Sequence, residues 1–162
     1  MQKTYSSLEE IKLVGITVRT CNKDELDIKT AKIMPCVQEY FMQQVAKNIP
    51  NRTNYGVTYC VYTDYESDYQ GQYTFFIGEE VGSFGNAAEE LEKLVIPKQK
   101  YIKFTTGTGP MPKIAIDSWN KIWQMSPQDL GGTRSYRADF EIYGQRAIDP
   151  QNTALDIYIG VN

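Results

Sequence analysis

Residues 137–144 read RADFEIYG, and this short stretch decides how the C-terminal part of the chain can fold. Successive side chains of a strand point to opposite faces, so Phe140 and Ile142 share one face while Glu141 and Tyr143 share the other. Residues 155–161, LDIYIGV, alternate in the same way, and we expect the two stretches to pair. The apolar sets should pack against a helix, which leaves Glu141 and Tyr143 on the second face.

A similar order of elements can be followed along the whole chain. Short β-branched or alternating runs predict strands, and a proline before a run with apolar residues four apart predicts a helix. The link at residues 64–70 is too short for a crossover helix, so the strands on either side of it should form an antiparallel hairpin. The predicted elements are a strand at 12–20, a helix from Pro35 to about 48, strands at 56–63 and 71–81, a strand at 94–105 broken at Pro97, a helix from Pro112 to about 125, and strands at 136–143 and 155–161.

This order repeats, which indicates a duplication. Both helices begin with Met-Pro, at residues 34 and 111, an offset of 77, and the strands that follow begin at Gly56 and Arg137, an offset of 81. The sequence therefore predicts an α+β fold: a tandem β-α-β-β repeat with antiparallel sheets, pseudo-twofold symmetry and a pocket between the halves. The half-repeats are expected at about 12–81 and 94–162, within a single domain that spans residues 1–162.

Composition limits the classes of partner. The 17 basic and 20 acidic residues are scattered along the chain, which argues against direct nucleic-acid binding. The N-terminus lacks the apolar core of a signal peptide, and no apolar run approaches the length of a membrane span. Three cysteines without CxxC spacing indicate reduced thiols. We therefore expect a cytoplasmic protein that does not act in the membrane.

The chain contains no histidine, which removes the Ser-His-Asp and Cys-His reaction schemes and the commonest transition-metal ligand. The Gly107-Thr-Gly109 turn lacks the rest of a dinucleotide fingerprint. The acids at positions 64, 66 and 68 lack the glycine and the final glutamate of a calcium loop. We expect neither a cofactor nor a metal site.

Glu141 allows two interpretations. If its face of the sheet is exposed to solvent, the acid belongs to an ordinary solvated surface. If the other half of the molecule covers that face, Glu141 is a buried carboxylate whose pKa rises, and it requires a partner. A cationic ligand would be such a partner.

The abundance of rings favours a pocket around this acid. Trp119 and Trp123 lie four residues apart on the second predicted helix and share a face. Strand aromatics and helix tryptophans are also ordinary core residues, so each ring alone has a purely structural explanation. Together they form a candidate ligand site with the acid. The predicted site residues are Glu141, Trp119, Trp123, Tyr59, Tyr73 and Tyr143.

Four segments carry a resemblance to a known family. They are YTDYESDYQGQYTFFIG at 62–78, IPKQKYIKF at 96–104, SWNKIW at 118–123 and ADFEIYG with DP and LDIYIGV at 138–161. In this order they resemble the GyrI-like small-molecule-binding family, which is related to the effector-binding domains of AraC-type and multidrug-sensing MerR-type regulators. The similarity covers residues 12–162. It implies the tandem fold and a central pocket.

The resemblance also implies roles for particular residues. Glu141 matches the family's pocket glutamate, which contacts cationic or amphipathic drugs, and Trp119 and Trp123 match positions where the family places aromatics. Such regulators usually carry a DNA-binding helix-turn-helix ahead of the sensor, and residues 1–11 leave no room for one. We therefore expect no DNA-binding domain here and a separate regulator protein as partner for any role in transcription.

Three functions remain open from the sequence. The first is a stand-alone binding domain for hydrophobic, cationic small molecules, with an aromatic pocket and Glu141 at its centre. The second is a hydrolase of strained electrophilic cytotoxic compounds, because similar enzymes exist in the family and Glu141 would act as general base. The third is an inhibitor that binds a larger protein through a surface patch.

Overall fold

The computed structural model describes all residues, 1–162, and confirms the α+β fold class. One antiparallel sheet contains eight strands. The strands are β1 (Gln2–Leu8), β2 (Ile11–Cys21), β3 (Thr58–Thr63), β4 (Gln72–Glu80), β5 (Glu92–Ile96), β6 (Gln99–Thr105), β7 (Ala138–Tyr143) and β8 (Asp156–Val161). The helices are α1 (Asn22–Glu25), α2 (Ile33–Met42), α3 (Lys113–Trp123) and α4 (Pro127–Leu130), with the 3-10 turns η1 (Val45–Asn48) and η2 (Gln145–Ala147). None of these helices combines the length and apolar character needed to cross a membrane.

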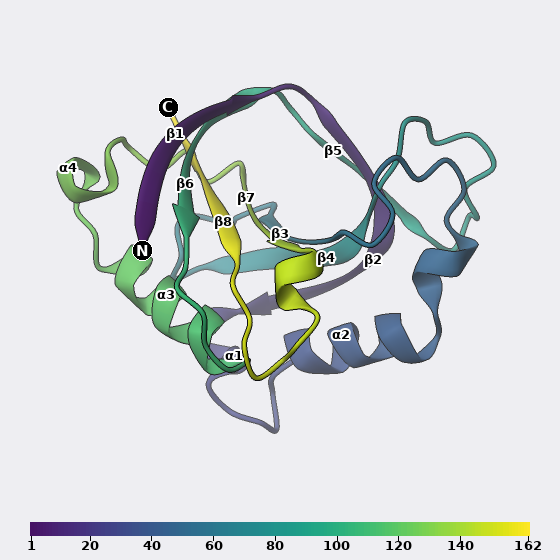
Figure 1. Ribbon diagram of the computed structural model, residues 1–162, viewed down its shortest axis with the longest axis horizontal. Coiled ribbons are helices and arrows are strands. Elements are labelled where there is room, and N and C mark those ends of the chain that lie inside the picture. The colour runs from purple at the N-terminus through teal and green to yellow at the C-terminus, as the bar shows by residue number, and fades with distance from the viewer.

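The order of strands across the sheet is symmetric about its centre. It runs β1-β6-β8-β7-β3-β4-β2-β5 (Figure 1). From the central pair outward, β3, β4, β2 and β5 on one side match β7, β8, β6 and β1 on the other. This order confirms the tandem repeat and the pseudo-twofold relation between its halves.

Two strands extend the predicted repeat. Residues 2–8, for which no strand was predicted, form β1, and β1 pairs with β6 of the second half. The break predicted at Pro97 is confirmed, and the segment before it forms β5, which pairs with β2 of the first half. Each half thus begins with a strand that pairs with the other half, and this exchange joins the two units into one sheet.

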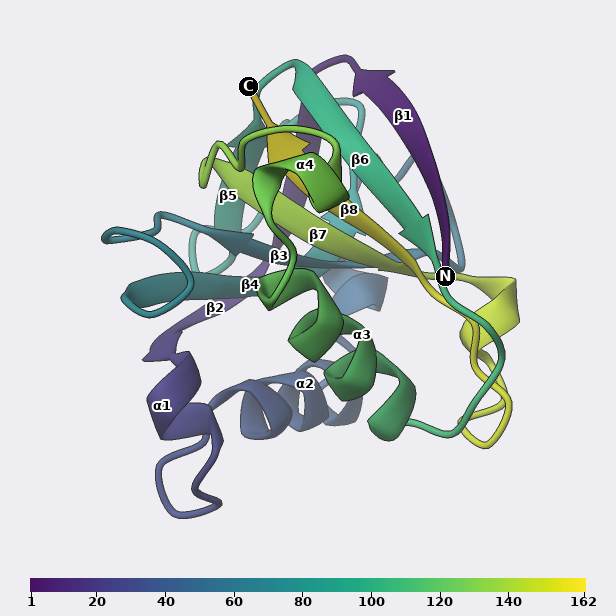
Figure 2. The ribbon, with the colours of Figure 1, turned by 90° about the vertical axis from the view of Figure 1, so that its left-hand side faces the viewer.

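The two long helices lie side by side on one face of the sheet (Figure 2). Beneath α2, one core cluster includes Tyr40, Phe75 and Ile77, and beneath α3 a second includes Trp119 and Ile157. A third cluster fills the opposite face. It contains Leu13, Tyr59, Val61, Phe76, Ile96, Tyr101, Ala138 and Phe140. The helix face is therefore divided into two apolar patches.

The strand register corrects one expectation about the faces. Residues directly opposite each other in an antiparallel pair share a face, and Ile157 is opposite Glu141. The prediction that residues 155, 157, 159 and 161 pack against a helix is confirmed, because they lie in the cluster beneath α3. The same prediction for Phe140 and Ile142 is wrong, since both pack on the helix-free face. Glu141 is the residue that faces the helices.

Both predicted helices end earlier than expected. The α2 helix stops at Met42, because Gln44 adopts the left-handed conformation before η1 begins. The α3 helix stops at Trp123. Ser126 then caps α4, accepting a hydrogen bond from the backbone N–H of Asp129.

Two glycines allow a close backbone contact between β2 and β4. Gly15 and Gly78 are register partners. A Cβ atom at Gly15 would stand 2.0 Å from the carbonyl oxygen of Ile77, and one at Gly78 would stand 2.2 Å from the carbonyl oxygen of Val14. The strands can cross this closely only without side chains at these two positions.

Candidate functional site

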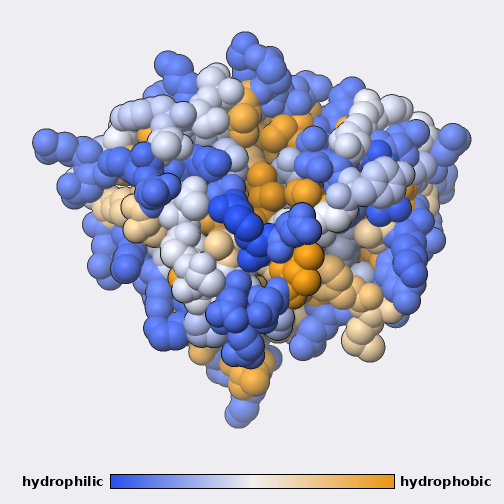
Figure 3. Space-filling view, viewed as in Figure 1, coloured by the Kyte–Doolittle hydropathy of each residue, from blue (hydrophilic) through white to orange (hydrophobic).

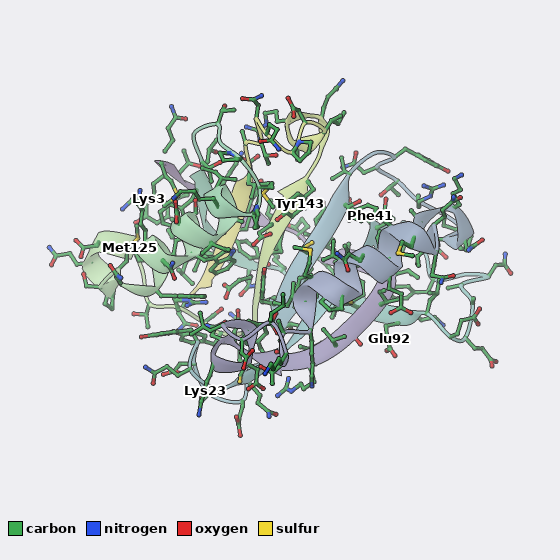
Figure 4. All side chains as sticks on the ribbon, turned by 90° about the horizontal axis from the view of Figure 1, so that it is seen from below. Lys3, Lys23, Phe41, Glu92, Met125 and Tyr143 are labelled. Carbon is green, nitrogen blue, oxygen red and sulfur yellow. The ribbon has the colours of Figure 1, made fainter.

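A cavity of about 780 Å³ lies on the helix face of the sheet. Its walls come from α2 and α3 and its floor from β3, β4 and β7, so both halves of the repeat contribute. Of the 28 residues that line it, 20 are hydrophobic. Viewed from the helix side, Tyr143 lies between the two helices (Figure 4). A cavity of this size and character suits a drug-sized apolar ligand.

Glu141 lies in the floor of the cavity and is only 2% exposed. One carboxylate oxygen, Oε1, accepts hydrogen bonds from the indole N–H of Trp119 and from the hydroxyl of Tyr62, the latter at 3.0 Å. The other oxygen, Oε2, accepts a bond of 2.5 Å from the hydroxyl of Tyr143. All three donors are neutral groups with aromatic rings.

Burial governs the protonation of this cluster. Desolvation raises the pKa of Glu141, while the hydrogen bonds from Tyr143, Trp119 and Tyr62 act in the opposite direction. Burial, together with the nearby Glu141, also raises the pKa of both tyrosines well above the ordinary value of a phenol. The tyrosines therefore remain protonated donors, and Glu141 is the group that can change its charge.

Three acids are buried in the molecule, and they differ in their cationic neighbours. Asp139 forms an ion pair with Arg134 at 2.5 Å. Glu79 accepts hydrogen bonds from Tyr40 and Thr58, and its pKa, raised by burial, is lowered in part by the charge of Arg52. Glu141 has neither an ion pair nor a cation among the groups that shift its pKa. It is the one buried acid whose charge no residue of the chain neutralises.

The structure brings five of the six predicted site residues to the cavity. Trp119 is buried and contacts Tyr62 edge to face, with ring centroids 5.0 Å apart. Trp123 stacks on Tyr69 with the ring planes 9° apart. The hydroxyl of Tyr73 donates to the side-chain oxygen of Asn22 at 2.9 Å. Glu141 and Tyr143 complete the set.

Tyr59, the sixth, does not reach the cavity. Its ring packs against Phe140 on the helix-free face, and its hydroxyl donates to Glu80 at 3.2 Å. The assignment of Tyr59 to the site is wrong because it lies opposite Gly78 in the hairpin, whereas Tyr73 has the other parity. The hairpin register separates the two tyrosines onto different faces.

Tyr62 takes the place expected for Tyr59, and sequence reasoning missed it. The repeat offset of 81 residues, read from the strand starts, relates position 62 to position 143. That offset therefore pairs Tyr62 with Tyr143, and it would have indicated a second tyrosine beside Glu141. Tyr65, Tyr69 and Arg134 also line the cavity, and no sequence pattern identified them.

The cavity is lined mostly by apolar and aromatic side chains, and Glu141 is the one buried acid among them. No group of three or more His, Cys, Asp or Glu side chains is gathered as metal ligands anywhere in the molecule. A positive charge that enters the cavity would meet aromatic rings and the buried carboxylate of Glu141, whereas the second lining acid, Glu25, already accepts hydrogen bonds from Thr20, Lys32 and Ile33. Rings attract cations through their faces, and a desolvated carboxylate attracts them through charge.

The chain is similar in sequence to known proteins over most of its length. The family model for integron-associated effector binding proteins matches residues 6–161. The chain is 27% identical, over 154 residues, to YobU of Bacillus subtilis (strain 168), which bears the provisional name of a transcriptional regulator protein. That match covers 93% of this chain and 91% of YobU.

Solved structures share the fold over nearly the whole chain. The integron cassette protein VCH_CASS2 from the mobile metagenome of Vibrio cholerae is 29% identical, with a TM-score of 0.78 and coverage of 99% of this chain and 95% of that chain. SAV2435, solved with tetraphenylphosphonium bound, is 18% identical with a TM-score of 0.77, covering 100% of this chain and 94% of that chain. Together with the family match, these comparisons confirm the GyrI-like resemblance, and the chain belongs to the family of integron-associated effector binding proteins.

Proposed function

We propose that this protein binds hydrophobic cations in the cavity between its halves, with Glu141 as the counter-charge. The observation that carries the proposal is the position of Glu141, a buried acid in the floor of an apolar cavity without a cation of its own. Rings and apolar walls would supply affinity, and the carboxylate would select positive charge. A cation against a ring face gains roughly 0.5 to 2 kcal/mol, so several rings and one acid suffice for micromolar binding.

The bound molecule in SAV2435 supports the same chemistry. Tetraphenylphosphonium is a lipophilic cation without hydrogen-bond donors, and the fold that holds it covers all of this chain. The name of YobU supports a regulatory use of such binding. We extend the proposal accordingly: the protein acts as an effector sensor, and a separate DNA-binding chain carries its signal.

The test is the affinity for tetraphenylphosphonium, measured by calorimetry on the wild type and on Glu141→Gln. The amide keeps the size of the side chain but removes its charge, and we expect the affinity to fall about tenfold or more. Glu80→Gln is the matched control, because Glu80 also accepts a hydrogen bond from a tyrosine but lies on the helix-free face. Equal affinity of the wild type and Glu141→Gln would overturn the proposal.

A hydrolase is the second candidate, favoured by the two phenols beside the acid. Glu141 could take a proton from water, and the hydroxyl of Tyr62 or Tyr143 could protonate the oxygen of an opening strained ring. Incubation with an epoxide-bearing aromatic compound, followed by mass spectrometry, separates the two functions. Diol formation that disappears in Glu141→Gln would establish turnover, and an unchanged compound that still binds would leave only the binding role.

A further inference from the structure

A second acid, Glu25, lines the cavity beside the N-terminus of α2 and is half-buried. Its oxygen Oε2 accepts hydrogen bonds from the hydroxyl of Thr20 at 2.7 Å and from the backbone N–H of Lys32 at 2.8 Å. The other oxygen, Oε1, accepts one from the backbone N–H of Ile33 at 3.0 Å. These bonds fix the position of the carboxylate at the cavity.

The charge of Glu25 is not cancelled by the groups that bind it. All three donors are neutral, and the N-terminus of α2 adds only about half a positive charge. Glu25 takes part in none of the ion pairs of the molecule. The ammonium group of Lys32 donates instead to the backbone carbonyl of Arg19 at 3.1 Å. Glu25 therefore keeps a net negative charge that a bound cation can balance.

The charges that line the cavity do not sum to zero. Its charged lining residues are Glu25, Arg134 and Glu141. Arg134 is already balanced by its ion pair with the buried Asp139. With Glu141 ionised, two negative charges therefore remain without a positive partner. Water screens charges at a half-buried or buried site less than on an open surface, so both acids attract cations.

The phenol of Tyr73 lies between the two acids. Its hydroxyl donates to Asn22 of α1, the helix that also carries Glu25, at 2.9 Å. Its ring contacts the ring of Tyr62, with centroids 5.7 Å apart, and the hydroxyl of Tyr62 donates to Glu141. Burial raises the pKa of Tyr73, and the charges of Glu25 and Glu141 both raise it further. One ring thus connects the surroundings of both carboxylates.

The sheet sets the separation of the two acids. Glu141 lies on β7, and Thr20, which binds Glu25, lies on β2, three strand steps away. The register row that contains Glu141 reaches β2 at Ile16, four residues before Thr20. In a flat sheet the Cα atoms of Thr20 and Glu141 would lie about 19 Å apart. A decyl chain with a cationic group at each end can bridge acids at this separation.

The surface between the acids suits a hydrocarbon chain. The lining there includes Tyr62, Tyr73 and Phe75. Leu26 follows Glu25, lines the cavity and is 90% exposed, and Ile28 in the same loop is 93% exposed. Apolar side chains are visible at the lower tip of the molecule, where the loop after α1 lies (Figure 3). An apolar linker would cover part of this exposed surface.

We infer that the preferred ligands of this cavity are elongated dications, with one positive group at Glu141 and the second at Glu25. This inference rests on the proposed function, because it adds a second charge and a length to the same class of ligand. It distinguishes linear molecules with a cation at each end from those with a single charged group.

Two probes of equal length and shape test the second charge. Both are triphenylphosphonium cations with a decyl chain. The chain of one probe ends in a trimethylammonium group, and the chain of the other ends in a tert-butyl group, which has nearly the same shape without the charge. Calorimetry measures the ratio of their affinities on the wild type, on Glu25→Gln and on Asp27→Asn.

The expected result is a selective loss in Glu25→Gln. The amide oxygen can still accept hydrogen bonds, but the charge is gone, so the affinity ratio of the dication to the tert-butyl probe should fall about fivefold. Asp27→Asn is the matched control, because it removes the same charge from an exposed residue of the same loop that does not line the cavity. It should keep the wild-type ratio.

The outcomes separate this inference from the proposed function. An unchanged ratio in Glu25→Gln, or an equal fall in Asp27→Asn, overturns the inference, while binding of the tert-butyl probe that depends on Glu141 leaves the proposed function standing. If the tert-butyl probe does not bind the wild type, or binds Glu141→Gln equally well, the proposed function fails and the inference fails with it.

A measurement on the wild type covers loss of folding in Glu25→Gln. The backbone N–H groups of Lys32 and Ile33 donate to Glu25, so a cation at its carboxylate should move their NMR signals. These two signals should differ between the complexes with the dication and with the tert-butyl probe. Identical signals in the two complexes would overturn the second site.

Discussion

Cys60 and Glu141 are register partners across the two central strands of the sheet. The repeat offset of 81 residues relates the same two positions, so the pseudo-twofold axis passes between them. One half of the molecule places a thiol at this point and the other half places an acid. The cavity is therefore symmetric in its phenols, Tyr62 and Tyr143, but asymmetric in charge.

A single acid at the centre predicts a simple pH dependence of binding. Because burial raises the pKa of Glu141 in the empty cavity, a bound cation should lower it and release a proton. The affinity for tetraphenylphosphonium should rise with pH up to the pKa of the empty site and then become constant. Calorimetry in buffers of different ionisation enthalpy measures the released proton directly.

The chain has no histidine, so few other groups titrate between pH 5 and 8 and add to the measured proton release. Glu79 is a second acid whose pKa burial raises, and Glu79→Gln is therefore the control. Proton release should persist in that variant and vanish in Glu141→Gln. Binding that is independent of pH from 4 to 9 would contradict the proposed role of Glu141.

The hydroxyls of Tyr62 and Tyr143 should both lower the pKa of Glu141, because both donate hydrogen bonds to its carboxylate. Tyr62→Phe and Tyr143→Phe each remove one donor to the carboxylate, which favours the protonated acid. We expect the pH midpoint of cation binding to move upward by about one unit in each variant. Tyr59→Phe, whose hydroxyl binds Glu80 on the other face, should leave the midpoint in place. A downward shift in either variant would refute this account.

Much of the fold was accessible from the sequence, because period-two alternation and the spacing of prolines reflect local physics. The hairpin at 58–80, the break at Pro97 and the two helices follow from such signals. The strand β1 was missed because its sequence, QKTYSSL, is largely polar and mostly exposed. An edge strand that pairs with one neighbour needs little apolar character, so it leaves little trace in the hydropathy pattern.

The candidate site was only partly accessible for a different reason. Parity along one strand places Glu141 and Tyr143 on the same face, but it does not determine which face the helices cover. That choice depends on the register between strands, which the sequence does not state. Tyr59 was assigned to the wrong face for this reason. Arg134 was not predicted to line the cavity, because it belongs to no repeating pattern of the sequence.

The close contact of β2 and β4 gives a prediction about stability. Gly15→Ala would place a Cβ atom 2.0 Å from the carbonyl oxygen of Ile77, so the β2–β4 pair must shift. We expect a loss of about 1–3 kcal/mol in the free energy of unfolding, measured by urea titration. Gly107→Ala is the control, because a Cβ atom there meets nothing within 4 Å. Similar stabilities of the two variants would contradict the contact.

The unpaired acid should lower the stability of the empty protein at alkaline pH, where burial opposes its charged form. A carboxyl group whose pKa is raised by folding stabilises the folded state fully below its unfolded pKa, and this contribution is lost as pH rises through the folded pKa. Glu141→Gln cannot ionise, so it should unfold at a higher temperature than the wild type at pH 8, and the difference should shrink toward pH 4. Each kcal/mol corresponds to about 2–4 °C in a chain of this size.

Glu39→Gln, at an exposed glutamate of α2, should show no such trend. A lower melting temperature for Glu141→Gln at pH 8 would mean that the three hydrogen bonds of the carboxylate outweigh the cost of burying its charge. Added tetraphenylphosphonium should reverse the order at pH 8, because the cation stabilises only the protein that carries the charge. Loss of stability in the empty state and gain of stability on binding would then have the same cause, an acid that lacks a cation until the ligand brings one.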